Sequence, residues 1–103
     1  MKEFDVTIVG LGPAGGTLAN LLAMHGFSIL ILDREKSFYP LPRAVHFDDE
    51  IMRVFQTIGI TKDFLKHTII NKGTKFVNSK DKVILDWPRP KKITDNGWYP
   101  SYR

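Results

Sequence analysis

The apolar positions in the first third of the chain predict a strand, a helix and a second strand. Residues 4–9 are rich in β-branched side chains and form the first strand. Residues 13–25 have helical spacing, and Gly26 follows where a left-handed cap would end the helix. The expected apolar face of this helix comprises Ala14, Leu18, Leu21 and Leu22. Residues 28–32 are almost all apolar, which is typical of a parallel strand covered on both faces, so the three segments predict a right-handed β-α-β unit.

The middle of the chain predicts a long loop followed by a helix. Residues 33–46 show no periodicity and contain Pro40 and Pro42, so we expect an ordered loop, and long loops in compact folds usually have a function. A second helix is expected to begin after the N-cap Asp48 and to end at Gly59. The expected apolar face of the second helix comprises Ile51, Val54, Phe55 and Ile58.

The last third of the chain changes from helical to extended patterning. A short third helix is expected from Thr61. Residues 75–77 and 83–85 flank a polar stretch, which predicts a β-hairpin. Three prolines from residue 88 onwards predict an irregular remainder. The chain therefore has the mixture of strands and helices that is typical of an α/β protein.

The composition limits what such a chain can do. Its 103 residues, 43% of them hydrophobic and 25% charged, are enough for one modest globular domain but few for a large sheet covered on both sides. The absence of cysteine excludes disulfides and thiolate metal sites. No stretch has the pattern of a signal peptide or a membrane span, so we expect a cytoplasmic protein without a membrane partner.

The charged residues do not predict a nucleic-acid or metal site. The net charge is +4, with −3 in residues 1–50 and +7 in residues 51–103. The solvated face of a hairpin is the more ordinary interpretation of the basic half, so we expect no nucleic-acid partner. His46 and the acids at 48–50 resemble a ligand cluster, but Asp48 already caps a helix and the other two acids suit its positive end. No metal site is therefore expected.

A glycine motif carries the chemistry. Gly10, Gly12 and Gly15 have the G-x-G-x-x-G spacing between the first strand and the first helix, and Asp33 ends the second strand 23 positions after Gly10. Such glycines permit a tight turn, close approach of a pyrophosphate, and close packing of helix on strand, while the acid accepts hydrogen bonds from ribose. A turn that serves packing alone does not explain the acid. We therefore predict an α/β fold: a Rossmann-like FAD- or NAD(P)-binding β-α-β unit with extra helices and a hairpin, in an incomplete doubly wound sheet.

Residues around the motif bear on the choice of dinucleotide. Pro13 and Ala14 follow the second glycine, as they commonly do in FAD-binding flavoproteins. The similarity continues through residues 39–44, 47–50 and 97–100. Over nearly its whole length the chain resembles the group A flavoprotein aromatic hydroxylases, in particular those that act on 3-(3-hydroxyphenyl)propionate and related phenols. The glycine motif is common to many families, whereas the later segments are more specific to this family.

The resemblance implies a cofactor and a set of contacts. FAD is the expected cofactor, NAD(P)H the co-substrate that reduces it, and a phenolic ring the acceptor of one oxygen atom from O2. Arg43 is implied to pair with the pyrophosphate or ribose of FAD, which suits a planar guanidinium, whereas a surface role is more typical of Arg34. The expected cofactor-binding residues are Gly10, Gly12, Pro13, Ala14, Gly15, Asp33, Arg34 and Arg43, and no catalytic residue is expected in this chain.

Two alternatives to a flavin hydroxylase stay open. Flavoproteins more often have Glu at the end of the second strand and NAD-binding proteins often have Asp, so Asp33 also fits an NAD-dependent dehydrogenase half-domain. The alternative outside enzymes is a non-catalytic dinucleotide-fold fragment that acts as a binding or assembly module.

The resemblance also implies a larger parent protein, with two further FAD-contacting motifs that this chain lacks. We therefore interpret the chain as the N-terminal portion of a flavin hydroxylase, inactive on its own. Residues 1–72 would belong to its FAD-binding domain and residues 73–103 to the sheet of its substrate domain. The first two strands would lack their usual neighbours, so we expect self-association or pairing with another chain.

Overall fold

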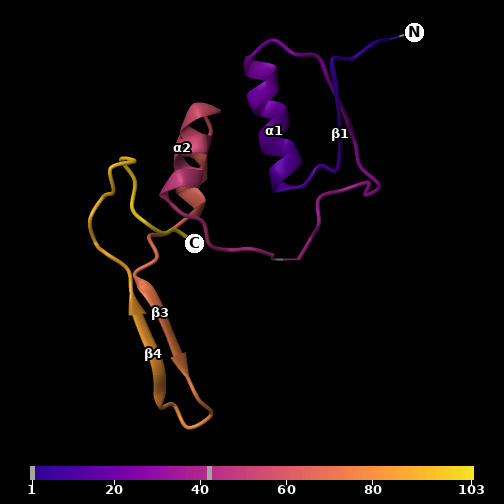
Figure 1. The fold of residues 1–103 in the computed structure, drawn as a ribbon. Helices are drawn as coiled ribbons and strands as arrows, with labels where there is room; N and C mark the ends of the chain where they lie inside the picture. The colour runs from indigo at the N-terminus through magenta and orange to yellow at the C-terminus, as the bar shows by residue number, and fades with distance from the viewer. Residues whose placement is uncertain (1, 42) are drawn as a thin grey trace. The chain divides into compact units, whose positions relative to one another are not determined.

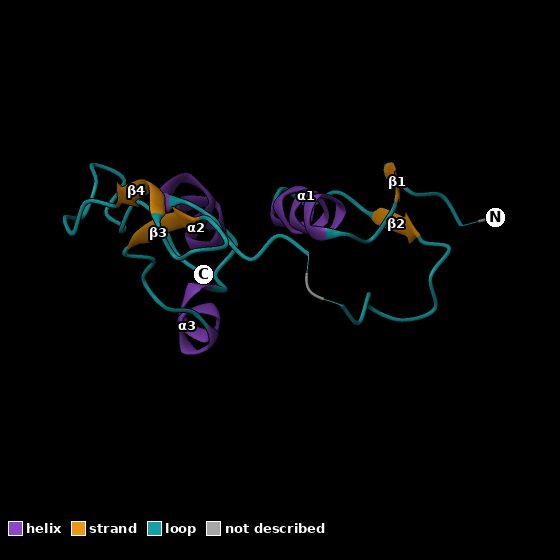
Figure 2. Cartoon of the chain, turned by 90° about the horizontal axis from the view of Figure 1, so that it is seen from below, coloured by secondary structure: helices purple, strands orange, loops and turns teal. Residues whose placement is uncertain are grey.

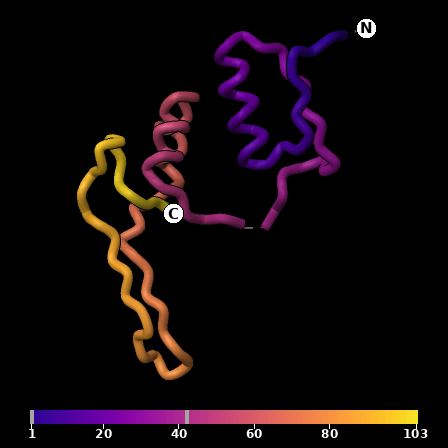
Figure 3. Tube along the Cα trace, viewed as in Figure 1, coloured from indigo at the N-terminus to yellow at the C-terminus, as the bar shows by residue number. Residues whose placement is uncertain are grey.

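The computed structural model describes residues 2–41 and 43–103, so Pro42 of the predicted loop lies outside the described residues. The chain divides into two compact units, Met1–Pro42 and Arg43–Arg103, and each is described by itself. Figures 1 and 3 follow the backbone of each unit along the chain. None of the helices found in the described ranges is long and apolar enough to cross a membrane.

The first unit contains strand β1 (Val6–Val9), helix α1 (Pro13–Met24) and strand β2 (Ile29–Leu32). The two strands pair in parallel, with Val6 opposite Ile29. Helix α1 connects them and lies along one side of the pair (Figures 1 and 2). The order of elements and the parallel pairing are those that the sequence predicts, and the boundaries differ by at most two residues. The fold is thus mixed α/β with small sheets.

Hydrogen bonds of Asp5 join the starts of the two strands. Its Oδ2 accepts from the hydroxyl of Ser28 at 2.6 Å and from the N–H of Ser28 at 2.7 Å. The N–H of Asp5 donates in return to the carbonyl oxygen of Ser28 at 3.0 Å. The side-chain and backbone hydrogen bonds from Ser28 lower the pKa of the Asp5 carboxyl. These hydrogen bonds therefore fix the register of β1 and β2 at the residues that precede both strands.

Helix α1 packs through small residues, not through the face that its leucines predict. Ala19 is buried, whereas Ala14 is exposed and Leu18 is 47% exposed. Gly15, one turn before Ala19, lies so close to β1 that a Cβ atom there would be 3.4 Å from Cγ2 of Ile8. A face of glycine and alanine lets the helix approach the strands closely, because no long side chain separates the backbones. The predicted apolar face was therefore wrong at Ala14 and Leu18.

Strand β2 is not covered on both faces, contrary to the prediction. Three of its residues are half-buried and Leu32 is exposed. In the neighbouring strand Val9 is 84% exposed. Helix α1 covers one side of a two-stranded sheet, and in the described part of this unit no further element covers the other side. The apolar side chains of β2 are therefore partly exposed to solvent.

The second unit contains three short helical elements and a hairpin (Figure 2). These are α2 (Asp49–Thr57), α3 (Thr61–Phe64), a 3-10 turn (Leu65–His67), and the strands β3 (Gly73–Val77) and β4 (Val83–Pro88). The strands pair antiparallel. The predicted helices and hairpin are confirmed, and β4 continues further than predicted, to Pro88.

Helix α2 has the predicted N-cap but a different buried side. Oδ1 of Asp48 accepts the N–H of Ile51 at 3.0 Å. Met52 is fully buried, whereas Ile51 is 41% exposed. The other three positions of the predicted apolar face are half-buried. The predicted apolar face was therefore wrong at Ile51 and did not include Met52, which is the fully buried side chain in the core of this unit.

An aromatic cluster completes the core of the second unit. The ring centroid of Phe47 lies 4.9 Å from that of Phe64 and 5.6 Å from that of Tyr102. The ring centroids of Phe55 and Phe64 lie 4.6 Å apart. The buried Tyr102 also forms backbone bridges to Phe47 and Ile70. The end of the chain, predicted to be irregular, thus packs into the core.

The substitution Met52→Ala tests this core. The loss of a fully buried side chain leaves a cavity, so we expect the free energy of unfolding to fall by about 2–5 kcal/mol. Ile51→Ala, at the neighbouring exposed position, should cost less than about 1 kcal/mol. Both tryptophans, Trp87 and Trp98, belong to the second unit, so urea unfolding followed by tryptophan fluorescence measures its stability. Equal losses in the two variants would contradict the central place of Met52.

Candidate dinucleotide-binding site

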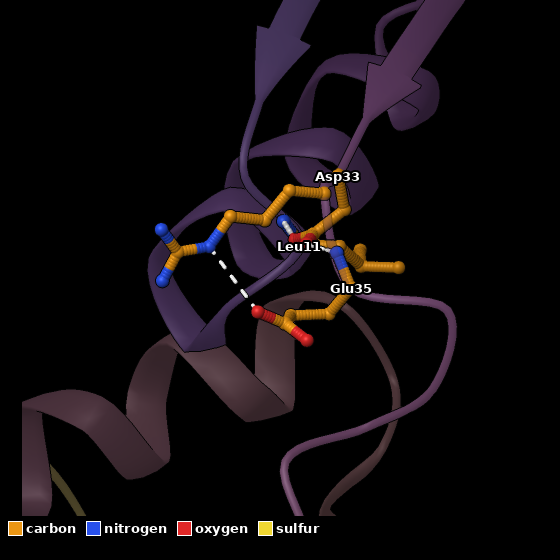
Figure 4. Close-up of polar contacts among 4 residues, drawn as sticks. Leu11, Asp33 and Glu35 are labelled. Carbon is orange, nitrogen blue, oxygen red and sulfur yellow. Dashed lines mark hydrogen bonds and ion pairs between the residues drawn. The ribbon is translucent and has the colours of Figure 1, made fainter.

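The glycine turn and Asp33 lie at the same edge of the first unit. Because β1 and β2 are parallel, the turn after β1 and the residue after β2 both follow carboxyl ends of neighbouring strands. The N–H of Gly10 donates to the carbonyl oxygen of Leu32 at 2.7 Å, which extends the pairing to the start of the turn. Figure 4 shows Asp33 beside Leu11 of the turn. The structure therefore brings together the two parts of the predicted motif.

Backbone N–H groups hold the Asp33 carboxylate in place. Its Oδ2 accepts from the N–H of Leu11 at 2.5 Å, and its Oδ1 accepts from the N–H of Glu35 at 2.8 Å (Figure 4). The hydrogen bond from Leu11, followed by that from Glu35, lowers the pKa of the Asp33 carboxyl below its ordinary value. Asp33 is exposed, and a carboxylate oxygen can accept more than one hydrogen bond. The site thus has an ionised acceptor with capacity for a ligand.

The first turn of α1 presents donors that the protein does not use. Gly12 is the N-cap and has no side chain to cap the helix, and Pro13 has no N–H. Across residues 2–41 and 43–103, the N–H groups of Gly12, Ala14 and Gly15 have no acceptor. No acidic side chain lies in this turn. Unpaired N–H groups at the positive end of a helix favour an anion.

The glycines leave room in front of these donors. A Cβ on Gly15 would collide with the carbonyl oxygen of Gly10, so the helix can approach the strand only without a side chain there. A Cβ on Gly12 would meet no atom within 4 Å, so the backbone at this point faces open space. Gly10 has a φ of +105°, which favours glycine. The donors, the open space and the lack of an acidic residue in the first turn of α1 fit a diphosphate.

The two predicted arginines differ in what the structure shows of them. The side chain of Arg34 is 93% exposed, and its Nε lies 3.2 Å from Oε1 of Glu35. This exposure agrees with the surface character expected of Arg34. Arg43 belongs to the second unit, so its contact with a cofactor held by the first unit stays a prediction.

The glycine turn, the free donors and the strand-terminal carboxylate are what a dinucleotide requires of an α/β protein. Comparison with known families is more specific. The family described as "FAD binding domain" matches residues 3–101 of this chain. The chain therefore belongs to the FAD-binding domain family, and the predicted cofactor FAD is confirmed at the level of the family.

The names of similar proteins belong to the group of enzymes that the sequence resembles, the flavoprotein aromatic hydroxylases. A probable NADH-specific resorcinol 4-hydroxylase of Rhodococcus jostii (strain RHA1) is 47% identical over 85 residues, which cover 82% of this chain and 16% of the relative. A 3-(3-hydroxy-phenyl)propionate/3-hydroxycinnamic acid hydroxylase of Mycolicibacterium gilvum (strain PYR-GCK) is 40% identical over 88 residues, which cover 85% of this chain and 16% of the relative. The predicted resemblance to flavin-dependent aromatic hydroxylases is therefore confirmed, and the chain spans 16% of the length of these relatives.

Solved structures share the fold. A p-nitrophenol 4-monooxygenase, PnpA from Pseudomonas putida DLL-E4, superposes with a TM-score of 0.71 over 81% of this chain and 21% of its own, at 24% identity. The protein pqsL, a probable FAD-dependent monooxygenase from Pseudomonas aeruginosa, superposes with a TM-score of 0.72 over 98% of this chain and 26% of its own, at 16% identity. At these identities the likeness shows the fold alone.

The substitution Gly15→Ala tests the close approach of helix to strand. The new methyl group would collide with the carbonyl oxygen of Gly10, so we expect the first unit to lose about 1–3 kcal/mol of stability. Gly16→Ala is the matched control, because a Cβ there would lie 3.9 Å from Cδ1 of Leu11, which is an ordinary contact. Hydrogen exchange of the β1 amides measures this unit separately. Equal protection in the two variants would show that the unit does not depend on Gly15.

The Asp33 carboxylate should make the first unit sensitive to acid. Because its folded-state pKa lies below the ordinary value of 3.8, the carboxylate stabilises the unit above pH 3.8. This contribution is lost as the pH falls from 3.8 through the lower folded-state pKa. We expect the amide proton of Leu11, which donates to Asp33, to titrate in NMR spectra with a midpoint below 3.8. A midpoint at or above 3.8 would show that the carboxylate is not held in this way.

Proposed function

We propose that this chain provides the FAD-binding part of a flavin-dependent monooxygenase that hydroxylates a phenolic or related aromatic substrate with NAD(P)H and O2. The family match and the names of the two relatives support the proposal. Because the chain spans 16% of those relatives, the activity is proposed for the whole protein. The chain on its own is proposed to be inactive.

The observation that carries the proposal is the set of unpaired donors at the start of α1. In the proposed Rossmann-like site, the diphosphate of FAD accepts hydrogen bonds from the N–H groups of Gly12, Ala14 and Gly15. Pro13 suits the first helical position because it needs no acceptor. Asp33 accepts hydrogen bonds from the ribose of the adenosine half. When bound, FAD supplies the redox chemistry, and the protein binds and orients it.

Assignments of two arginines and two residue ranges extend the proposal to the rest of the chain. Arg43 would pair with the pyrophosphate or ribose of FAD through its planar guanidinium, and the exposed Arg34 would add positive charge near the adenosine half. Residues 1–72 would belong to the FAD-binding domain of the whole protein and residues 73–103 to the sheet of its substrate domain. All six residues of β4 are exposed, which supports a hairpin that further strands cover.

Exposed apolar strands support the proposed pairing with further protein. Val9 and Leu32 are exposed at the ends of the first sheet, and Ile84 is exposed in the hairpin. Apolar strand surfaces in water favour association, because burial removes them from water and pairs their free edges. We propose that this surface is covered by self-association or by another polypeptide segment. We also propose a cytoplasmic location for the protein.

Isothermal titration calorimetry with FAD and with NAD+ tests the cofactor. We expect the full chain to bind FAD at least about tenfold more tightly than NAD+. A chain that bound NAD+ as tightly as FAD would favour the dehydrogenase half-domain, and a chain that bound neither would favour the non-catalytic module.

A pair of glycine variants tests the proposed diphosphate site. A methyl group in Gly12→Ala enters the open space where the backbone must approach the diphosphate, so we expect FAD affinity to fall at least about tenfold while stability is retained. Gly16→Ala adds the same group deeper in the same helix and should leave affinity unchanged. Unchanged affinity in Gly12→Ala would mean that FAD binds elsewhere on the chain.

A further inference from the structure

Asn96 and Gly97 form a dipeptide that is chemically labile in proteins. The backbone nitrogen of the residue after an asparagine can attack the carbon of the side-chain amide. Glycine in that position hinders the attack least, because it has no side chain and its backbone is the most permissive. The chain has asparagine at residues 20, 71, 78 and 96, and only the last of these is followed by glycine.

The turn that contains this pair depends on both residues. Residues 94–97 are closed by a hydrogen bond of 2.9 Å from the N–H of Gly97 to the carbonyl oxygen of Thr94. Gly97 has a φ of +81°, which favours glycine. Nδ2 of Asn96 donates at 2.7 Å to Oδ2 of Asp49, the first residue of α2. The same oxygen accepts the hydroxyl of Thr94 at 2.6 Å. The labile pair therefore joins the segment after β4 to the start of α2.

The same hydrogen bonds hold the two groups that would react. The attacking group is the backbone nitrogen of Gly97, whose N–H donates to Thr94. The leaving group is the side-chain nitrogen of Asn96, which donates to Asp49. Neither hydrogen bond survives the reaction, because the first nitrogen loses its hydrogen and the second leaves the protein. The folded turn therefore slows the reaction, which proceeds through an opened state of the turn.

We propose that Asn96 is a deamidation site that the folded turn protects and that opening of the turn exposes. The nitrogen of Gly97 forms a bond to Cγ of Asn96 and loses its proton, while the bond from Cγ to Nδ2 breaks and Nδ2 leaves with that proton as ammonia. Water then adds across one of the two ring C–N bonds of the succinimide, which gives aspartate or isoaspartate. A groove of about 470 Å³, lined in part by both residues, gives water access to the pair.

The product does not fit the turn as asparagine does. Deamidation replaces the amide donor of Asn96 with a carboxylate, and its partner Asp49 is an acid already. The hydrogen bond from Thr94, followed by that from Asn96, lowers the pKa of the Asp49 carboxyl below its ordinary value. Two carboxylates at hydrogen-bond distance repel each other. The segment after β4 is thus released from α2, and the loss of ammonia makes the release permanent.

The original full chain provides the first test, without a substitution. We expect Asn96 to deamidate at least about tenfold more slowly in native buffer than in urea at the same mildly alkaline pH, because the folded turn holds both reacting groups. Peptide mass spectrometry that separates aspartate from isoaspartate measures the rate at each asparagine. Equal rates in native buffer and in urea would overturn the proposal.

The substitution Asp49→Ala tests the source of the protection. It removes the acceptor of the Asn96 amide, so we expect deamidation at residue 96 to become at least about tenfold faster in native buffer. Glu50→Ala removes the neighbouring exposed acid from the same turn of α2 and should leave the rate unchanged. Asn78, whose Oδ1 accepts backbone N–H groups in the hairpin turn, should keep its rate and so reports that the variant is folded. An unchanged rate at Asn96 in Asp49→Ala would contradict the proposal.

The substitution Asn96→Asp tests the consequence of deamidation. The new carboxylate lies beside Asp49, so we expect the protection of the Gly97 amide against hydrogen exchange to fall at least about tenfold. Asn78→Asp makes the same chemical change in the hairpin turn and should leave this protection unchanged. Full protection of the Gly97 amide in Asn96→Asp would show that deamidation does not release the segment.

Discussion

The first unit depends on the close approach of helix α1 to strand β1 at Gly15. The carbonyl oxygen of Gly10 occupies the place that a side chain of Gly15 would need, and the buried Ala19 continues the same small face one turn later. The short distance lets the chain turn directly from strand to helix through residues 10–12. The constraint that packs the helix therefore also leaves its first N–H groups at the strand edge, without protein acceptors.

Asp33 connects this turn to the second strand. Its carboxylate accepts one hydrogen bond from the N–H of Leu11 in the glycine turn and one from the N–H of Glu35 in the loop after β2. It therefore stabilises the backbone of both segments. The same hydrogen bonds lower the pKa of this carboxyl below its ordinary value. An acid so close to an anion site would repel a phosphate directly beside it, but it can accept the ribose hydroxyls that adjoin the diphosphate. In the proposed site one residue thus shapes the turn and contacts the cofactor.

The sequence predicted features that depend on neighbouring residues and missed those that depend on distant ones. The strands, the glycine turn and the cap at Asp48 were predictable, because each is encoded within a few positions. The packed face of α1 was not, because leucine spacing indicates an apolar stripe but does not reveal where small residues permit a closer contact. The packing of Tyr102 into the core was missed for a related reason: Tyr102 pairs with Phe47, which lies far away in sequence, so no local periodicity indicates the contact.

The site was predictable to a similar extent. Spacing alone placed Asp33 at the edge of the turn, since two parallel strands end on the same side. Its hydrogen bond to Leu11 has no signal in the sequence, because any residue supplies a backbone N–H. Arg34 is exposed as expected, and the role of Arg43 rests on resemblance to the family. Family membership then decided between FAD and NAD, which the acid at residue 33 alone could not.

The central claim is that the N–H groups at the start of α1 bind the diphosphate of FAD. The most direct measurement is a map of amide NMR shifts as the isotope-labelled chain is titrated with FAD. The account predicts that the largest saturable shifts occur at Gly12, Ala14 and Gly15, with the Leu11 amide also affected through Asp33. Shifts confined to other parts of the chain, with these amides unchanged, would contradict it.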